Sequence, residues 1–569
     1  MNDDIKRAEQ PATTPEILTE PAPDTSHTKQ TSVAKSAGIV SIAVMFSRVL
    51  GLVREQIFAY YFGAGFLMDA YIVAFRIPNV LRDLFAEGAL SAAFVKVFTD
   101  YQIKKGEPAA WRLASLVLNA LAVVLSAITI IGILITPYAL PLLVSGFSPE
   151  KIALAVTMTQ IMFPFILLIA LAAVAMGVLN TKGIFGVPAS ASTVFNIVSI
   201  IFGLGFAFWL SGGGWLSSAN DNGIPDAAAQ WAIIGMAVGT LIGGAAQFAM
   251  QLPSLFKVGF RFSPILSFTD EGVKQVMRLM APAILGTSAV QINVLVNTMF
   301  VSDINGAQGW LNYAFRLMQF PIGVFGVAIG TASIPTLSRM ASSGNIKEFR
   351  QTLASSLKLV FLLTLPSACG LIVLGEPIIR LIYERGKFHE GDTTMAAYAL
   401  AGYSIGLTGY AAIKVLSPAF YALNDAKTPM IIAVCSIAVN ALASYLFRDL
   451  LAPYNLGHVG VALATSSVAL VNFFALALIM RKRIAGIDGR EIIASFIKIA
   501  VASAAMSAVC YFSYNLLTNW LGAKTLIVKL VEAFVPIALG GIAFVFAAKI
   551  LRVSEVNKLF NALKRKLNR

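Results

Sequence analysis

Long apolar runs, separated by short polar segments, repeat along almost the whole chain. A helix needs roughly 20 apolar residues to cross the hydrocarbon core of a membrane. The runs are continuous, unlike the short alternating strands of a transmembrane β-barrel, and in lipid the backbone groups must be satisfied internally. The pattern predicts an all-α polytopic membrane protein with fourteen spans, at residues 36–61, 66–98, 110–135, 151–179, 187–210, 229–252, 276–302, 309–337, 351–378, 393–421, 429–447, 457–480, 491–516 and 527–551.

The connections between these spans alternate in charge. Those that include "YQIKKGEPAAWR", "NTKG", "NDAKTP" and "RKRIAGIDGR" carry Lys or Arg, whereas "LPLLVSGFSPE" and "SDINGAQGW" carry neither. Because Lys and Arg gather in cytoplasmic loops, the alternation predicts that both termini are cytoplasmic. The segment "RLIYERGKFHEGD" and Lys524 depart from this rule.

Composition agrees with a membrane protein. Of the 569 residues, 57% are hydrophobic and 13% charged, against about 25% charged in soluble domains. The net charge of +14 is explained by basic loops, so no nucleic-acid partner is expected. The cysteines lie in apolar runs and the three histidines are scattered, so neither a disulfide nor a metal site is predicted. No cleavable signal peptide is expected: residues 1–35 are predicted to be a disordered cytoplasmic tail, and residues 552–569 a basic one.

The chain contains a weak internal repeat. Ala74–Ala93 aligns without gaps on Ala314–Ser333, and Leu179–Asn196 aligns on Leu423–Asn440. These matches place span 2 over span 8 and span 5 over span 11, which predicts two six-helix units in the same orientation, with two spans left over. Parallel repeats around a midplane site are typical of transporters. Shared membrane-helix composition is the alternative explanation.

Charged residues occur within the first predicted span. At 100° per residue, Ser47, Arg48, Gly51, Arg54 and Glu55 share a helix face about 120° wide. A charge at the bilayer centre costs about 2.5–3.5 kcal/mol on insertion scales. This face is therefore predicted to line a wet or protein-lined cavity.

Two more predicted spans carry charges. Span 2 places Asp69, Arg76, Asp83 and Glu87 close to one stripe, with Asn79 off the stripe and Arg82 further off. Pro78 is expected to bend this helix. Span 8 contributes Arg316, the repeat mate of Arg76, and then Pro321 and several glycines that predict a bendable, closely packed helix. Lys414 in span 10 is assigned equally to the lumen or to helix packing.

Four arginines, Arg48, Arg54, Arg82 and Arg316, outnumber the nearby acids Glu55, Asp69 and Glu87. The guanidinium fork matches phosphate oxygens bidentately. An excess of such groups in a lumen predicts an anionic ligand. The alternative is that each arginine forms an ion pair with an acid and only stabilises the packing of the helices.

These residues also carry a family resemblance. The segment "SRVLGLVRE…FGAGFLMDAYIVAFRIPNVLRDLFAEGALSAAF", followed in order by "APAILGTSAVQINVLVNTMF", "YAFRLMQFPIGVFGVAIGTASIPTLSR" and "KVLSPAFYALNDAKTP", resembles the MurJ (MviN) family of lipid II flippases. The resemblance implies the V-shaped MOP exporter fold. It divides the chain into an N-lobe at 36–252, a C-lobe at 253–447 and 457–480, and a lipid-tail groove formed by spans 13 and 14 at 491–551.

The same resemblance implies a function: moving lipid II, an undecaprenyl-diphosphate-linked peptidoglycan precursor, across the bacterial inner membrane by alternating access. Arg48, Arg54, Arg82 and Arg316 match family positions that hold the diphosphate. Asp69, Asn79 and Glu87 match portal and gate positions, to which we add Ser47, Gly51 and Glu55. Lipid II and membrane lipid are the implied partners, no cofactor is implied, and the coupling ion is left open.

The chain departs from some relatives. Asp83 stands where some have a second basic residue, and span 7 offers Asn293 and Asn297 but no acid for a sodium site. Three alternatives are kept: an O-antigen lipid flippase, a drug antiporter, and a membrane-embedded glycosyltransferase or phosphatase. An arginine-rich lumen disfavours a drug-cation antiporter, and the absence of clustered acids or histidines at a membrane face disfavours an enzyme.

Overall fold

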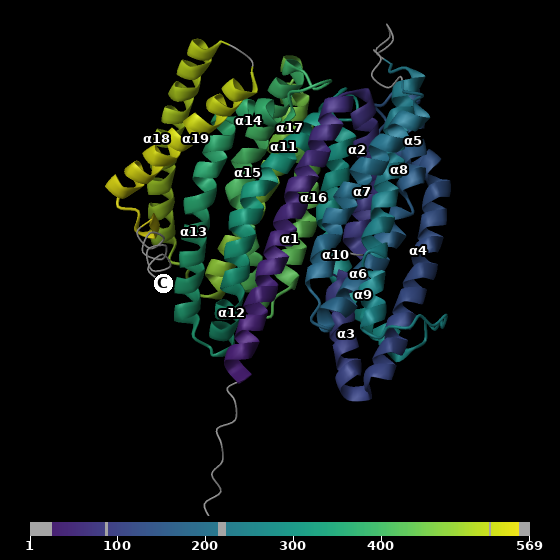
Figure 1. The fold of residues 1–569 in the computed structure, drawn as a ribbon. Coiled ribbons are helices and arrows are strands. Elements are labelled where there is room, and N and C mark those ends of the chain that lie inside the picture. Colours follow the sequence, from purple (N-terminus) through teal and green to yellow (C-terminus); the bar gives the residue numbers. More distant parts are fainter. Residues whose placement is uncertain (1–24, 86–88, 214–223, 523–524, 557–569) are drawn as a thin grey trace, which may run out of the picture.

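The computed structural model describes residues 25–85, 89–213, 224–522 and 525–556, and their regular structure is helical (Figure 1). The helices are α1 (Thr25–Phe62), α2 (Phe66–Phe85), α3 (Ala89–Lys105), α4 (Glu107–Leu143), α5 (Pro149–Met162), α6 (Phe165–Thr181), α7 (Gly186–Leu210), α8 (Ala227–Ala249), α9 (Leu252–Lys257), α10 (Glu271–Phe300), α11 (Ala307–Pro321), the π-helix η1 (Ile322–Val327), α12 (Ala328–Ser342), α13 (Ile346–Val373), α14 (Gly375–Tyr383), α15 (Glu390–Ala422), α16 (Lys427–Leu451), the 3₁₀ helix η2 (Ala452–Tyr454), α17 (Gly457–Arg483), α18 (Gly489–Leu521) and α19 (Leu526–Ile550).

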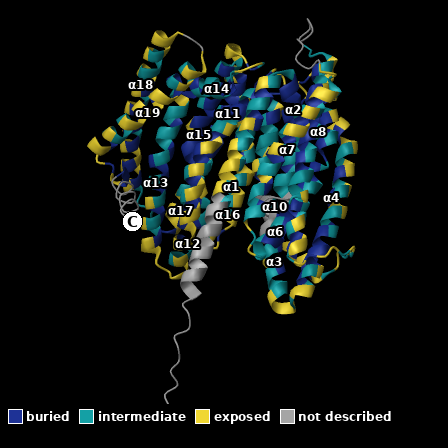
Figure 2. Ribbon diagram, in the orientation of Figure 1, coloured by how far each residue is buried: buried dark blue, intermediate teal, exposed yellow. Residues whose placement is uncertain are grey.

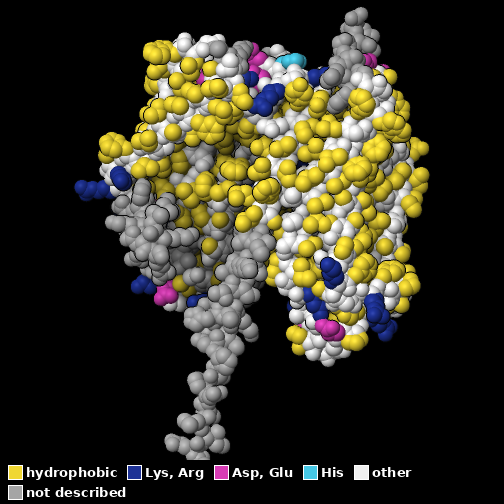
Figure 3. Space-filling view, in the orientation of Figure 1, with side chains coloured by type: hydrophobic (Ala, Val, Ile, Leu, Met, Phe, Trp, Pro, Cys, Tyr) yellow, Lys and Arg dark blue, Asp and Glu magenta, His cyan; other side chains and the backbone are white. Residues whose placement is uncertain are grey.

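Within the described residues, 11 helical segments are long and apolar enough to cross a membrane, each 25 to 37 residues in length. The predicted all-helical membrane fold is confirmed at this level, whereas the count of fourteen is not established. The other three predicted spans coincide with α1, α2–α3 and α10, which carry much of the polar chemistry described below. Hydrophobic side chains cover the middle of the molecule, and many of the visible charged ones lie towards its ends (Figure 3).

Several helix boundaries differ from those predicted. Helix α1 begins at Thr25, so the end of the segment predicted to be a disordered tail is helical, while residues 1–24 lie outside the described part. Helix α2 continues through Pro78 without a break. Pro321, where the sequence predicts a bendable helix, is followed by a π-helical turn over Ile322–Val327.

The helices form two groups in Figure 1. Helices α2 to α9 lie on the right and α11 to α19 on the left, with α1 crossing in front and packing on α7. Helix α10 contacts both groups, through α3 and α16. Close approach of small residues supports the contact between α7 and α8, which is typical of membrane helices.

The buried cores reveal how the two groups meet. One continuous apolar cluster includes Phe58 of α1, Tyr71 of α2, Tyr313 of α11 and Tyr383 of α14, and α14 lies near the upper end of Figure 1. Towards the lower end the core divides: one cluster joins α3, α4, α6 and part of α10, and another joins α12, α13, α15, α17 and α18. Burial in Figure 2 follows these contacts, with exposed residues on the outer faces. Among the described residues, the two groups therefore share a buried apolar core near the upper end but not below it.

Candidate functional site

Helices α1 and α11 run antiparallel and bring three charged residues together. Glu55 Oε1 lies 3.0 Å from Arg316 Nη2 and 3.4 Å from Arg54 Nη2. Its other oxygen accepts a hydrogen bond from Asn312 Nδ2 at 3.3 Å. Two arginines therefore share one buried carboxylate, which leaves a surplus positive charge at this point.

The guanidinium of Arg54 is buried but only partly satisfied. Its side chain is 9% exposed, and it lies 5.1 Å from the centre of the Phe195 ring on α7. Its Nε and Nη1 atoms have no hydrogen-bond partner among the described residues. Because buried donors without acceptors are costly, these N–H groups favour the approach of an anion. Arg316, with 45% of its side chain exposed, faces an accessible space.

The other predicted residues of α1 lie nearby. Arg48 is exposed, and its Nη1 lies against Gly323 of η1, where an added Cβ would approach it to 2.7 Å. The carbonyl of Ser47 accepts a hydrogen bond from Asn196 Nδ2 of α7 at 3.2 Å. Gly51 faces the same amide. Ser47 and Gly51 therefore seat α1 on α7, while Arg48 reaches the opposite group.

On α2 the arginines lie in other environments. Arg82 forms an ion pair with the adjacent Asp83 at 2.8 Å, and Asp83 also accepts from Gln291 of α10 at 3.0 Å. Arg76 donates to Thr298 at 2.5 Å. Arg82 thus has a carboxylate partner of its own, in contrast to Arg54 and Arg316. Asn79 is half-buried on α2, and Glu87 lies outside the described residues.

Asp69 occupies a different kind of position. It is fully buried, and it accepts hydrogen bonds from the backbone N–H groups of Gly306 and Gly309, at 2.7 and 3.0 Å. Lys151 of α5 lies 2.8 Å from it. Sequence reasoning missed Lys151, although a lysine at the start of an apolar run, on the side otherwise poor in Lys and Arg, was an available signal.

Polar contacts extend this junction, which we call the closed end. It consists of the C-terminal end of α1, the N-terminal ends of α2, α5 and α11, and the segment 382–389. Lys387 N donates to the Tyr60 carbonyl at 2.9 Å, and Tyr313 donates to the Gly63 carbonyl at 3.1 Å. Gln56 donates to the Ile382 carbonyl at 3.1 Å. The two helix groups are thus joined by polar as well as apolar contacts at the upper end.

A polar cluster joins α10, α16 and α17 where the sequence raised the question of sodium. Asn293 donates to Ser436, Asn297 donates to Thr465, and Asn440 donates to Asn297, at 2.8 to 3.1 Å. These neutral side chains bond mainly to one another. Among the described residues there is no group of three His, Cys, Asp or Glu side chains that could hold a metal ion.

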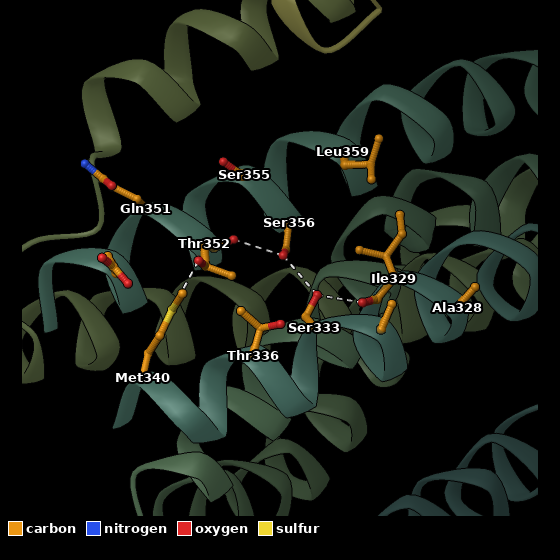
Figure 4. A pocket seen from close by; sticks show the side chains of 12 residues that line it. Ala328, Ile329, Ser333, Thr336, Met340, Gln351, Thr352, Ser355, Ser356 and Leu359 are labelled. Atoms are coloured by element: carbon orange, nitrogen blue, oxygen red, sulfur yellow. Dashed lines mark hydrogen bonds between the residues drawn. The ribbon is translucent and has the colours of Figure 1, made fainter. Parts of the chain in front are cut away.

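A separate cavity of about 600 Å³ lies between α12 and α13 (Figure 4). Hydroxyl groups line it, and Ser333 and Ser356 hydrogen-bond each other at 2.9 Å. Glu348 is its one charged lining residue. None of the candidate arginines lines this cavity, so it is separate from the charged cluster of Arg54, Glu55 and Arg316.

Charged residues near the upper end join the C-terminal helix α19 to α14 and to the segment that follows α14. Glu384 accepts hydrogen bonds from Lys529 of α19 at 3.1 Å and from Thr393 at 2.8 Å, and Arg380 lies 3.4 Å from it. Burial alone would raise the pKa of Glu384, but these hydrogen bonds and the nearby cations hold it below its ordinary value. This network fixes α19 beside α14.

Comparisons with known proteins identify the family. The family described as "Lipid II flippase MurJ" matches residues 58–531. The chain is 38% identical to the lipid II flippase MurJ of Burkholderia cenocepacia over 451 residues, which is 78% of this chain and 83% of that protein. It is 33% identical to a probable lipid II flippase MurJ of Vibrio cholerae, covering 86% of this chain and 90% of that protein.

Solved structures agree. A lipid II flippase MurJ in an inward closed conformation matches with a TM-score of 0.70 and 29% identity, over 90% of this chain and 98% of that one. An inward-facing MATE-family multidrug transporter of the MOP superfamily matches with a TM-score of 0.65 at 16% identity, over 80% and 99%, a likeness of fold alone. The chain therefore belongs to the lipid II flippase MurJ family.

Proposed function

We propose that this protein is a lipid II flippase, which moves the undecaprenyl-diphosphate-linked peptidoglycan precursor from the cytoplasmic to the periplasmic leaflet of the bacterial inner membrane. The observation that carries the proposal is the shared carboxylate of Glu55, which leaves Arg54 and Arg316 with surplus positive charge. A diphosphate supplies the oxygens that guanidinium forks prefer. Arg48 extends this positive surface along α1, and Arg82 is a further contact once it releases Asp83.

The arrangement of the cores supports an inward-facing state. The groups share a core at the upper end and have separate cores below, and the surface is indented between them towards the lower end (Figure 3). The connections rich in Lys and Arg, such as 343–350 and 481–490, lie at that lower end. By the positive-inside rule, the lower end and both termini are cytoplasmic.

In this proposal fourteen spans form two six-helix lobes, at 36–252 and at 253–447 with 457–480. Spans 13 and 14, at 491–551, provide a groove for the lipid tail. The headgroup enters from the cytoplasmic side and its diphosphate binds Arg54 and Arg316. The lobes then rock about the site, so that the closed end opens and the lower end closes. The tail remains in lipid throughout, so the chain acts as a transporter and no bond is made or broken.

Release requires the site to lose affinity in the outward-facing state. Glu55 is placed for this role, because it already competes for both arginines. An inside-negative membrane potential favours outward movement of an anion, by about 2.3 kcal/mol per charge per 100 mV. No coupling ion is assigned.

The test is depletion of the protein in cells, followed by a leaflet assay for the precursor. Lipid II should accumulate in the cytoplasmic leaflet, and complementation with the wild-type chain should restore its export. Arg54→Ala and Arg316→Ala should insert in the membrane but fail to complement. Normal export after depletion, in a cell with no second flippase, would refute the proposal.

A further inference from the structure

Lys151 is a buried lysine to which the transport site gives no role. It lies in the first turn of α5 and is 4% exposed. A cation at a helix N-terminus opposes the helix dipole, and an isolated buried ammonium is costly. Its position therefore requires specific compensation.

Four groups surround the Lys151 ammonium, including the Phe66 ring, whose centre lies 5.5 Å from Nζ. Nζ lies 2.8 Å from Asp69 Oδ2 and 3.1 Å from Asn305 Oδ1. The Phe147 ring centre is 4.4 Å from Nζ, which adds a cation–π contact. Asp69 supplies the only carboxylate that forms an ion pair with Lys151 among the described residues.

Asp69 in turn caps a helix of the other group. Gly306 is the N-cap of α11 and has no side chain to satisfy the first N–H groups. The Asp69 carboxylate, from α2, accepts from Gly306 N and Gly309 N. A negative charge at a helix N-terminus is favourable, so this cap stabilises the closed end from across the two groups.

The partners of Lys151 divide between the two groups. Asp69 lies on α2 and Phe147 just before α5, so both belong to the same group as Lys151. Helices α2 and α5 pack against each other. Asn305 and the α11 amides belong to the opposite side. When α11 departs, the Lys151–Asp69 pair can persist, so no isolated charge is left behind in either state.

We propose that Lys151 is a positioning residue of the closed end: it holds Asp69 charge-balanced and aimed at the N-terminus of α11, so that the end closes and opens reversibly. This role rests on the alternating access proposed above. Without Lys151 the closed end would bury the Asp69 charge with only backbone donors to balance it, whereas the open end would hydrate it. Loss of Lys151 should therefore favour the open end.

A cysteine pair across the closed end reports its population directly. Tyr60→Cys and Lys387→Cys, in a background with Cys369, Cys435 and Cys510 replaced by serine, place the two thiols where the backbones hydrogen-bond at 2.9 Å. The disulfide yield after brief oxidation in membranes measures how often the end is closed. This readout does not depend on the substrate, so it can fail or succeed separately from lipid II transport.

We expect Lys151→Met to lower the yield at least threefold, and Asp69→Asn to lower it further because it leaves the ammonium unpaired. The double variant should recover yield relative to the Asp69→Asn single, since both charges are gone. Lys151→Arg keeps the charge and should stay within twofold of wild type. Lys182→Met, which removes a lysine paired with Glu107 at the lower end, should have no effect.

Unchanged yield in Lys151→Met would overturn the role, as would a double variant that loses yield by the product of the two single effects. If Lys151→Met does not reach the membrane, Asn305→Ala removes only the bond that Lys151 makes to the other group. That variant should lower the yield about twofold, and an unchanged yield would count equally against the proposal.

Discussion

Asp69 Oδ1 accepts a hydrogen bond from Gly309 N across 240 residues of chain. Extending the repeat alignment of Ala74–Ala93 on Ala314–Ser333 places Asp69 directly over Gly309. Equivalent points of the two repeats therefore meet at the closed end. The first group contributes the start of predicted span 2, and the other group contributes the start of predicted span 8.

Gly309 lies so close to Ala64 that there is no room for a side chain at Gly309. A Cβ there would lie 2.9 Å from Ala64 Cβ and 3.0 Å from Ala64 Cα. We expect Gly309→Ala to push α11 away from Ala64 and to weaken the closed end by about 1–3 kcal/mol, the usual cost of overpacking. The Tyr60→Cys/Lys387→Cys disulfide yield measures this. Gly391→Ala, where nothing lies within 4 Å, is the matched control, and equal yields for the two variants would contradict the prediction.

Neutralising Glu55 should affect binding and transport in opposite directions. Glu55 is the carboxylate that both Arg54 and Arg316 contact. Glu55→Gln leaves these arginines free for a diphosphate, so affinity for a soluble diphosphate analogue should rise roughly 5–30-fold, equivalent to about 1–2 kcal/mol. Transport should nevertheless slow, because release is opposed. A binding titration and a vesicle flipping assay measure the two effects, and a fall in affinity would refute competition by Glu55.

A positive charge alone should not be enough at position 54. A lysine keeps the positive charge but presents a point charge on a flexible stem, without the planar fork. Arg54→Lys is expected to reduce lipid II transport at least about tenfold, with normal amounts in the membrane. Arg350→Lys, at a pair with Asp488 at the lower end, should transport normally. A wild-type rate for Arg54→Lys would show that bidentate contact is not needed.

The sequence was sufficient to predict the helical membrane class and the polar character of one face of α1. Each depends on local periodicity or on backbone chemistry, which sequence records directly. Ser47, Gly51 and Glu55 lie at helix contacts that such a face would make. The residues alone predicted a lumen with an anionic ligand. The family resemblance narrowed this prediction to a lipid II flippase, because the family's motifs occur in order along the chain.

What could not be predicted depends on tertiary partners. Helical phase placed Arg82 away from the charged stripe of α2, and it could not show that the neighbouring Asp83 is the ion-pair partner of Arg82. Helical phase also could not predict that Asp69 accepts hydrogen bonds from the backbone amides of α11, because the geometry of one helix does not reveal which other helix end lies near it. Lys151 was missed because its burial and its ion pair with Asp69 depend on how α2 and α5 pack.

The tight contact between α7 and α8 provides a test of the fold itself. A Cβ at Gly239 would lie 2.3 Å from both Cα and N of Gly203, and 2.9 Å from the Ser199 carbonyl. These are backbone atoms, so the helices must separate to admit even a methyl group. Membrane helices gain much of their association energy from such close packing. We therefore expect Gly239→Ala to destabilise the protein by at least about 1–3 kcal/mol.

Thermal unfolding in detergent measures this as a lower Tm, with recovery of monodisperse protein as a second readout. Gly205→Ala lies on α7, the same helix pair, but nothing is within 4 Å of its added Cβ. Its effect should stay within about 0.5 kcal/mol, and any gain in helix propensity would act in the stabilising direction. Because both variants add one methyl group to a helical glycine, a difference between them isolates the contact with Gly203. Equal Tm values would show that α7 and α8 do not approach as closely as the structure describes.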